Sequence, residues 1–471
     1  MGKDKRMEGG TGMTRRSFVG GVLAAGVAPM IVPPSVFGAT APSNRITVGG
    51  IGVGGIGRVQ LPLIREAGFE VVALCDVDDV YGKRGFDKFP DARRYRDFRQ
   101  LLADEGDRVD AIYCGTPDHT HAIVSLAALK AKKHLCCVKP LTRSVEECRV
   151  VVEAARRAGT ATQVTAAAWT EEGNMRSMEI IQAGILGDIS SVDMWSLRPV
   201  WPQGMPSYPA FTDRVPDTLD WDLWLGPAKK REFAARWPKG SPIPEMAKEN
   251  WCGDAVYHPF NFRGWFEFGA GALGDMGCHR ANPVYKALGL TWPSYVEASS
   301  THVSSVAFPL ASSVTFDYPK DGAHGDVQLR WTDGGILPVK PKEMGTEQLP
   351  AEGILYRGTK GDMLVAFVEG VSQEPRVFGT GAAEAAKLPR TLPRRQGGIY
   401  GEWLEACKGG EKASCNFDFA QYITEFVQLG NLAIQTGKGV SFDPVVMRVN
   451  GNDAANERLC IPYENGWKLK G

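Results

Sequence analysis

The stretch Arg45–Gly57, RITVGGIGVGGIG, decides the fold expected for this chain. Its first half, Ile46–Ile51, consists mostly of β-branched residues and glycine, which suits a buried parallel strand. The next six residues fit the pattern G-x-G-x-x-G, in which the glycines allow a tight turn, close approach of a pyrophosphate and close packing of the following helix. We therefore predict a dinucleotide-binding loop, with phosphate contacts from Gly52, Gly54, Gly55, Ile56 and Gly57.

A carboxylate at the end of the next apolar run supports this prediction. Arg58–Ala67 is expected to form a helix, and Phe69–Cys75 a second strand that closes with Asp76. A carboxylate about 20 residues after such a loop binds the adenine ribose hydroxyls. Asp76 would repel a 2′-phosphate and no arginine directly follows it, so we predict NAD, with NADP less favoured. Lys83 and Arg84 are the local residues able to accommodate NADP.

The rest of the chain predicts an α/β protein of more than one domain. At 471 residues it is too long for one ordinary core. Strand-like and helix-like segments alternate early, which predicts an N-terminal Rossmann dinucleotide-binding domain over residues 42–167. Strand-like runs with few helical crossovers then predict an α+β substrate and oligomerisation domain with a largely antiparallel open sheet over residues 168–395. We expect the C-terminal helices of residues 396–471 to pack back toward the first domain.

The composition narrows the partners and the chemistry. The chain has 54 basic and 54 acidic residues and a formal net charge of zero, which argues against a nucleic-acid partner. Its 10 cysteines lie mostly in or beside apolar runs and do not resemble a disulfide framework. There is no CxxC pair, so we predict no metal site.

The first residues, 1–41, differ from the rest. A basic start leads into Thr14-Arg15-Arg16-Ser17-Phe18-Val19 and then an uncharged, modestly apolar run broken by prolines. This pattern predicts a twin-arginine export signal, and hence contact with the Tat export machinery and a periplasmic location. The run is too short for a comfortable membrane span, so no stable membrane anchor is expected. The alternative is a disordered basic tail.

Three residues form a candidate catalytic set. Asp275 and His279 are spaced i and i+4, which places them on one face of a helix. A histidine is the usual general base near neutral pH, and a neighbouring carboxylate orients it. Lys139 follows a predicted strand, His134–Val138, and can stabilise charge on an alcohol or carbonyl oxygen.

With these motifs, the chain resembles the Gfo/Idh/MocA oxidoreductases from about Arg45 to Leu469. The resemblance rests on Gly52–Gly57, Thr116-Pro117-Asp118-His119-Thr120-His121, Lys139-Pro140 and Gly274-Asp275-Met276-Gly277-Cys278-His279. It implies that Lys139, Asp275 and His279 are catalytic and that Lys139 also contacts the cofactor. It further implies that Thr116, Pro117 and His121 line the cofactor on its nicotinamide side, and that the protein is a homo-oligomer, a dimer or tetramer. The family usually has glutamate where this chain has Val138.

The segments Arg198–Gly204, Trp221–Pro227 and Tyr257–Gly264 resemble the exported subgroup of that family. From the motifs in these segments we predict substrate contacts, together with His279, from Arg198, Trp201, Tyr257 and Arg263. His119 is expected to be a solvent-facing loop residue.

These features favour an exported NAD-dependent oxidoreductase that transfers hydride between a carbohydrate ring carbon and a nicotinamide cofactor, with His279 as general base. Two alternatives stay open. One is a redox-assisted glycoside hydrolase with a tightly bound NAD, and the other is a non-catalytic sugar-binding protein on the same scaffold. Release of an aglycone without accumulation of NADH would distinguish the redox-assisted hydrolase from a net oxidoreductase.

Overall fold

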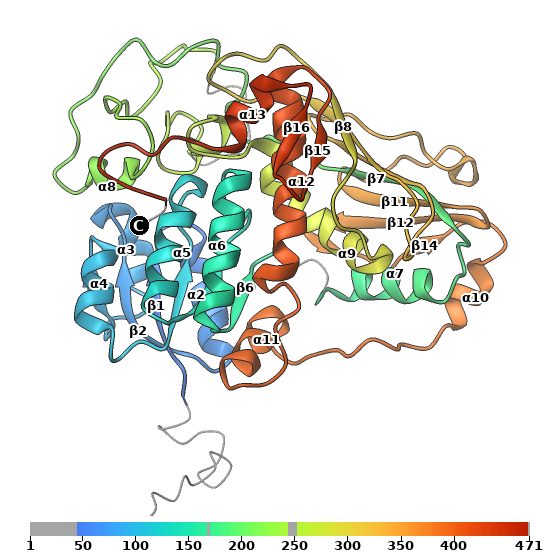
Figure 1. Ribbon diagram of the computed structural model, residues 1–471, viewed down its shortest axis with the longest axis horizontal. Coiled ribbons are helices and arrows are strands. Elements are labelled where there is room, and N and C mark those ends of the chain that lie inside the picture. The colour runs from blue at the N-terminus through green and yellow to red at the C-terminus, as the bar shows by residue number, and fades with distance from the viewer. Residues whose placement is uncertain (1–44, 167–169, 244–251, 470–471) are drawn as a thin grey trace, which may run out of the picture. The chain divides into compact units, whose positions relative to one another are not determined.

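The computed structural model describes residues 45–166, 170–243 and 252–469, and residues 46–471 form one compact unit (Figure 1). The predicted export signal, residues 1–41, lies outside the described residues, as does nearly all of the unit that precedes residue 46. The domain boundaries near residues 167 and 395 stay predictions.

The first sheet is six-stranded and entirely parallel, as predicted. Its order is β3-β2-β1-β4-β5-β6, so the direction of winding reverses between β1 and β4. The strands are β1 (Thr47–Ile51), β2 (Glu70–Cys75), β3 (Arg93–Tyr95), β4 (Ala111–Cys114), β5 (His134–Cys137) and β6 (Thr162–Val164). Ligands of such doubly wound folds bind at this reversal, outside the carboxyl ends of the strands.

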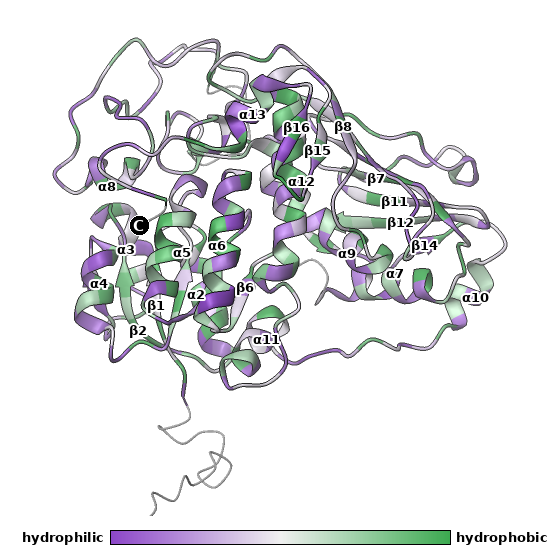
Figure 2. Ribbon diagram, in the orientation of Figure 1, coloured by the Kyte–Doolittle hydropathy of each residue, from purple (hydrophilic) through white to green (hydrophobic). Residues whose placement is uncertain are grey.

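Helices connect these strands. They are α2 (Gly57–Glu66), α3 (Asp79–Phe86), α4 (Phe98–Glu105), α5 (His121–Lys130) and α6 (Val145–Ala158). Helix α6 begins with a capping box: the Ser144 hydroxyl accepts from the Glu147 N–H, and the Glu147 carboxylate accepts from the Ser144 N–H. Figure 2 shows mixed polar and apolar faces on α4 and α6, as expected for helices that cover a sheet.

The second sheet is mixed and mostly antiparallel, with the order β13-β12-β11-β7-β10-β9-β8 and β14 paired to β12. Among its described strands only β7 and β10 run parallel. The strands are β7 (Ile189–Trp195), β8 (Tyr295–Ser300), β9 (Ser312–Tyr318), β10 (Val327–Thr332), β11 (Gly353–Gly358), β12 (Gly361–Val368), β13 (Val371–Ser372) and β14 (Arg376–Val377). Strand β9 alternates buried and half-buried residues, so one face of the sheet packs on the core.

Helices α7 (Glu172–Gln182), α9 (Cys278–Leu288) and α12 (Phe417–Thr436) pack on this sheet. Helix α12 also contacts α6, so it lies between the two sheets (Figure 1). Figure 2 shows both polar and apolar residues along α12, and most of them are buried because the helix is covered on several sides. Helix α11 (Gly398–Cys407) packs on the first sheet's side, where Trp403 stacks on Phe69 with ring centroids 4.5 Å apart.

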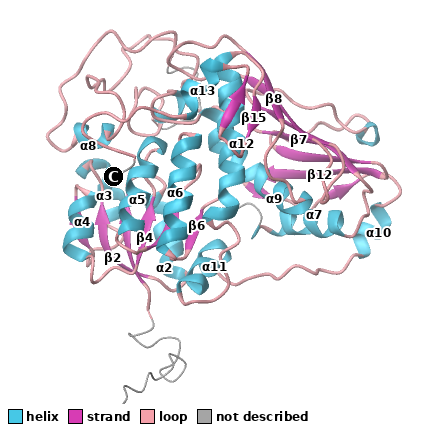
Figure 3. Ribbon diagram, in the orientation of Figure 1, coloured by secondary structure: helices cyan, strands magenta, loops and turns pink. Residues whose placement is uncertain are grey.

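The remaining elements are short. They are α8 (Trp221–Leu225), α10 (Ala382–Lys387), α13 (Asp453–Leu459), β15 (Ser441–Asp443) and β16 (Arg448–Asn450). Between β7 and α9 the described chain is mostly loop (Figure 3), held by a cluster of buried aromatic rings that includes Trp221, Trp265 and Phe268. No described helix is long and apolar enough to cross a membrane. All ten cysteines are described and none forms a disulfide; only Cys460 is exposed.

Candidate active site

A cavity of about 450 Å³ opens where the winding of the first sheet reverses. Turns after β1, β4 and β5 contribute Gly52, Gly115, Thr116, Pro117 and Lys139 to its wall. The later part of the chain contributes Arg198, Arg263, Asp275 and His279. Residues that sequence analysis took from four separate motifs therefore face one space.

The glycine loop forms one end of this cavity, through Gly52, Gly55 and Ile56. Gly52 has φ +80°, and a Cβ there would lie 2.6 Å from the Gly115 backbone, so only glycine fits this turn. Gly54 and Gly57 do not line the cavity. A Cβ on Gly54 would lie 2.5 Å from the Tyr81 carbonyl oxygen, which means that Gly54 lets α3 approach the loop. Gly54 was predicted to let a pyrophosphate approach the backbone. The structure instead requires glycine there because α3 approaches the loop.

Asp76 lines the cavity and holds the glycine loop in place. Its Oδ2 accepts hydrogen bonds from the backbone N–H groups of Val53 (2.9 Å) and Gly54 (2.8 Å), and its Oδ1 accepts from Asp78 N–H (3.1 Å). Burial raises the pKa of Asp76, although the backbone donors at Gly54 and Asp78 oppose the shift. The carboxylate therefore supports the loop from within, a contact that the spacing alone did not predict.

Lys139 and Asp275 form an ion pair in the wall of the cavity. Lys139 Nζ lies 2.6 Å from Asp275 Oδ1 and also donates to the Asp275 carbonyl oxygen. Two arginines share the same carboxylate: Arg263 Nε lies 3.1 Å from Oδ1, and Arg198 Nε lies 3.7 Å from Oδ2. Burial alone would raise the pKa of Asp275, but Lys139, Arg263 and Arg198 together hold it well below its usual range. Asp275 is thus ionised and is shared by three cationic side chains.

His279 faces the same cavity but is not hydrogen-bonded to Asp275 or to any other described residue. Burial, followed by the charges of Lys139 and Arg280, lowers the pKa of His279 to about 3. The imidazole is therefore neutral near pH 7, with one ring nitrogen unprotonated. The expected arrangement, in which Asp275 orients His279, does not occur here, because Asp275 gives its oxygens to Lys139 and Arg263.

The backbone explains this difference. Leu273–Gly277 is a π-helical turn that leads directly into α9, and it includes Asp275. A π-turn widens the local helix, so an i, i+4 pair across its end loses the face-to-face geometry of a regular helix. Such turns occur frequently at functional sites.

Thr116 and Pro117 line the cavity, but His121 does not. His121 is fully buried, with Nδ1 2.8 Å from the Pro140 carbonyl oxygen and Nε2 2.8 Å from the Thr116 carbonyl oxygen. It joins the turn after β4 to the turn after β5. The predicted cofactor contact of His121 is therefore corrected to a positioning role.

Two predicted substrate residues are also corrected. Trp201 is fully buried and donates from Nε1 to Gln203 Oε1 (2.8 Å), and Tyr257 is 1% exposed within the aromatic cluster. Neither lines the cavity. His119 was expected in solvent, but it is fully buried, with Nε2 2.8 Å from the Trp224 carbonyl oxygen. Burial lowers the pKa of His119 to about 3.

Five wall residues from the segment between β7 and α9 were not predicted as contacts: Leu223, Trp224, His258, Phe260 and Phe262. Phe260 has φ +70°, rare for an aromatic residue, and its ring lies 4.4 Å from the Arg263 guanidinium carbon. His258 Nε2 lies 3.0 Å from Asp78 Oδ2. Only the unusual density of aromatic residues in this segment could have indicated them.

One group of possible metal ligands exists among the described residues. Ligand atoms of Cys114, His121 and Cys137 all lie within 4.8 Å of one another. Both ring nitrogens of His121 already face carbonyl oxygens, so neither is directed at the two thiols alone. This group is explained by packing between β4 and β5.

Comparison with known proteins agrees with the fold. Residues 46–166 match the GFO_IDH_MocA family model, described as "Oxidoreductase family, NAD-binding Rossmann fold". This part of the chain therefore carries the NAD-binding fold of those oxidoreductases.

Inositol 2-dehydrogenase of Salmonella typhimurium is 30% identical over 146 residues, which cover 30% of this chain and 43% of that protein. The enzyme of the same name from Acidothermus cellulolyticus is 28% identical over 205 residues, which cover 41% of this chain and 58% of that protein. The chain thus spans about half the length of these relatives.

Solved structures extend the likeness to both sheets. The WlbA dehydrogenase of Bordetella pertussis, in complex with NADH and UDP-GlcNAcA, matches with a TM-score of 0.57 and 14% identity over 85% of this chain and 99% of that one. An aldose-aldose oxidoreductase from Caulobacter crescentus, complexed with glycerol, matches with a TM-score of 0.55 and 15% identity over 84% of this chain and all of that one. At these identities the likeness establishes the fold.

Proposed function

We propose that this chain is a Gfo/Idh/MocA oxidoreductase that transfers hydride between a ring carbon of a carbohydrate and NAD. The observation that carries the proposal is that Lys139, Asp275 and His279 share one cavity with the glycine loop. The NAD-binding family match and the dehydrogenase relatives support the same reaction class. We further propose that the protein is exported by the twin-arginine pathway, acts in the periplasm and is a homo-oligomer.

The cavity wall fits a dinucleotide. The turn at Gly52 leaves no Cβ where the backbone of Gly115 approaches, and Ile56 and Arg58 at the amino end of α2 line this space, where the helix dipole favours an anion. Gly52, Gly55 and Ile56 would hold the diphosphate, Asp76 the adenine ribose, and Thr116 and Pro117 the nicotinamide side. When bound there, the nicotinamide supplies the hydride acceptor.

The chain's own residues manage the proton. Neutral His279 accepts the proton of the substrate hydroxyl at a ring nitrogen as that carbon is oxidised. Lys139 donates a hydrogen bond to the same oxygen and stabilises its developing charge. Asp275 holds the Lys139 side chain in place through their ion pair. Arg198 and Arg263 keep Asp275 ionised and offer donors to neighbouring sugar hydroxyls.

The test is to purify the protein without added nucleotide, denature it and identify any nucleotide released, then follow NADH formation with a panel of sugars and cyclitols. We expect NAD in the extract and NADH formation with at least one of these compounds. His279→Ala should lower the rate by about 10²–10⁴-fold while NAD stays bound. Absence of nicotinamide nucleotide binding would contradict the proposal, and release of an aglycone without net NADH would favour the redox-assisted hydrolase instead.

A further inference from the structure

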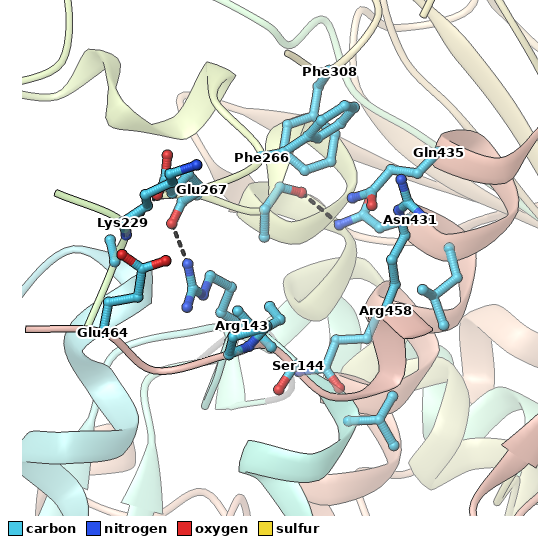
Figure 4. Close-up of a pocket in the computed structure, with 18 of the residues that line it drawn as sticks. Arg143, Ser144, Lys229, Phe266, Glu267, Phe308, Asn431, Gln435, Arg458 and Glu464 are labelled. Carbon is cyan, nitrogen blue, oxygen red and sulfur yellow. Dashed lines mark hydrogen bonds between the residues drawn. The ribbon is translucent and has the colours of Figure 1, made fainter. Parts of the chain in front are cut away.

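A second cavity, of about 580 Å³, shares no lining residue with the candidate active site. Its walls come from the start of α6, the middle of α12, the segment 266–270 and the C-terminal residues 458–464 (Figure 4). Its size lies in the range of cavities that hold small-molecule ligands. No residue proposed above for catalysis or cofactor binding belongs to it.

Positive charge predominates on this wall. The cationic side chains are Arg143, Lys229, Lys230, Arg231 and Arg458, and the acidic ones are Glu267 and Glu464. Glu267 is already paired with Arg231 and accepts from Lys229 N–H (2.6 Å) and Tyr208 O–H (3.2 Å). The Glu267 charge is therefore neutralised by Arg231, and Lys230 lies 3.8 Å from Asp222. The remaining cationic side chains of the wall are Arg143, Lys229 and Arg458, against the single carboxylate of Glu464.

Arg143 is the most informative of these residues, because its side chain is only 3% exposed. Its Nη1 donates to the Glu267 carbonyl oxygen (Figure 4), whereas Nε and Nη2 make no hydrogen bond to any described residue. The nearest carboxylate oxygen, Glu147 Oε1, is 4.0 Å from Nη2 and accepts from Tyr463 O–H at 2.9 Å. A buried guanidinium with unused donors is costly unless a ligand satisfies them.

Two wall residues also carry a buried amide oxygen without a hydrogen-bond partner among the described residues. Gln428 donates from Nε2 to the Thr142 carbonyl oxygen (2.9 Å), and its Oε1 has no hydrogen-bond partner among the described residues. Asn431 donates to the Ala270 carbonyl oxygen (2.9 Å), and its Oδ1 is likewise without one. Both side chains are more than nine-tenths buried. Figure 4 shows Asn431 across the cavity from Arg143.

Two further features complete the wall. Ser144 and Val145, at the amino end of the 14-residue helix α6, line the cavity and bring the positive end of the helix dipole to it. Phe266 and Phe308 meet edge to face, with centroids 4.5 Å apart, and form an apolar side. Such a surface suits the C–H face of a sugar ring, whereas the unused amide oxygens require hydroxyl donors.

We propose that this cavity is a second ligand site, which binds a monosaccharide-sized polyhydroxy acid of the hexuronate class. The carboxylate lies toward Arg143, Arg458 and the start of α6, and the hydroxyls donate to Gln428 and Asn431. The site does not depend on the oxidoreductase activity proposed above, because none of its residues takes part in that reaction.

The experiment is isothermal titration of the full chain with D-glucuronate, with D-glucose as the neutral counterpart and acetate as the counterpart without hydroxyls, all at one ionic strength. We expect glucuronate to bind at least about 10-fold more tightly than either. Arg143→Gln and Arg458→Ala should each weaken glucuronate binding about 10-fold or more, whereas Arg214→Ala, a control on an 84% exposed arginine, should not. Lys139→Ala, in the candidate active site, should leave this binding unchanged.

Several results would overturn the proposal. These are no binding of glucuronate, equal binding of acetate, unchanged binding in Arg458→Ala, or loss of binding in Lys139→Ala, which would move the ligand to the other cavity. Thermal unfolding identifies variants that fail to fold. Arg458 is exposed and its loss should not affect folding, so Arg458→Ala decides the outcome if Arg143→Gln does not fold.

Discussion

Lys139 Nζ lies 2.6 Å from Asp275 Oδ1, and this ion pair joins the turn after β5 to the π-turn before α9. Both side chains are largely buried, with 15% and 12% exposed, so the charges interact with little screening by solvent. The pair therefore fixes an ammonium donor beside His279 without using the histidine as its partner.

Lys139→Ala should lower kcat by about 100- to 1,000-fold, because it removes a fixed donor to the oxygen on which charge develops. Asp275 keeps Arg263 and Arg198 as partners, so the fold should persist. Steady-state kinetics and thermal unfolding check both statements. Lys130→Ala, at the exposed end of α5, is the matched control. A near-normal kcat in Lys139→Ala would remove Lys139 from the mechanism.

The lowered pKa of His279 predicts a specific pH dependence. With a folded pKa of about 3 and an unfolded value of about 6.5, the folded protein binds fewer protons than the unfolded one between these values. Above about pH 6.5 this histidine is neutral in both states and does not lower the free energy of unfolding. As the pH falls from about 6.5 toward 3, the unfolded protein gains a proton that the folded protein does not, so the free energy of unfolding decreases. We expect the stability of wild type relative to His279→Gln to fall by on the order of 1–2 kcal/mol between pH 7 and pH 5.

Chemical unfolding of both proteins at several pH values measures this difference, and other titrating groups cancel in the comparison. In the free enzyme, kcat/KM should show no inflection from His279 between pH 5 and 8, because the imidazole is already neutral. An inflection near 6.5 that disappears in His279→Gln would show that the histidine titrates normally and that its surroundings do not suppress its protonation.

Export is tested independently of the structure, since residues 1–41 lie outside the described part. Replacing Arg15 and Arg16 together with lysine keeps the charge but removes the twin arginine. We expect the folded protein to accumulate in the cytoplasm of the producing cell, as measured by cell fractionation. Replacement of Lys3 and Lys5 by arginine is the control. Periplasmic accumulation of the double lysine variant would mean that the arginine pair is incidental.

The sequence predicted the first sheet and the residues that meet at its edge, because each follows a strand in a parallel fold whose strand ends must converge. Lys139 was placed in this way, whereas Gly52 was placed by the glycine pattern and Thr116 by the family resemblance. Strand β3 was missed because it has only three polar residues, Arg93–Tyr95, at the sheet's edge. Strand β12 was also missed.

Residues in the loops between β7 and α9 were harder to place, because loops have no regular period that assigns side chains to a face. Arg198 and Arg263 line the cavity, and their contact with substrate stays a prediction, whereas Trp201 is buried away from the cavity and Phe260 lines its wall. His119 was misjudged because backbone carbonyl oxygens satisfy its ring, a contact that depends on tertiary structure.

The final prediction is that NAD binds more tightly than NADP, and that Asp76 is responsible. The carboxylate lines the cavity at the end of β2, and its Oδ2 is committed to Val53 and Gly54 N–H, so a 2′-phosphate would meet a fixed negative charge. Lys83, one local cation, pairs with Asp87 on the exposed side of α3. A preference of about 1–3 kcal/mol, roughly five- to 150-fold in Kd, is expected.

Asp76→Asn is the decisive variant, because asparagine keeps one oxygen to accept from the loop N–H groups while it removes the charge. In this variant the ratio of the Kd for NADP to the Kd for NAD should fall toward one. Asp76→Ser should narrow it too but also weaken both cofactors, since serine cannot reach the loop in the same way. Asp91→Asn, on an exposed carboxylate nearby in the sequence, is the control. Fluorescence titration of the nucleotide-free protein with both cofactors measures the ratio. Tighter binding of NADP by the wild type would mean that Lys83 or Arg84 turns over the ribose.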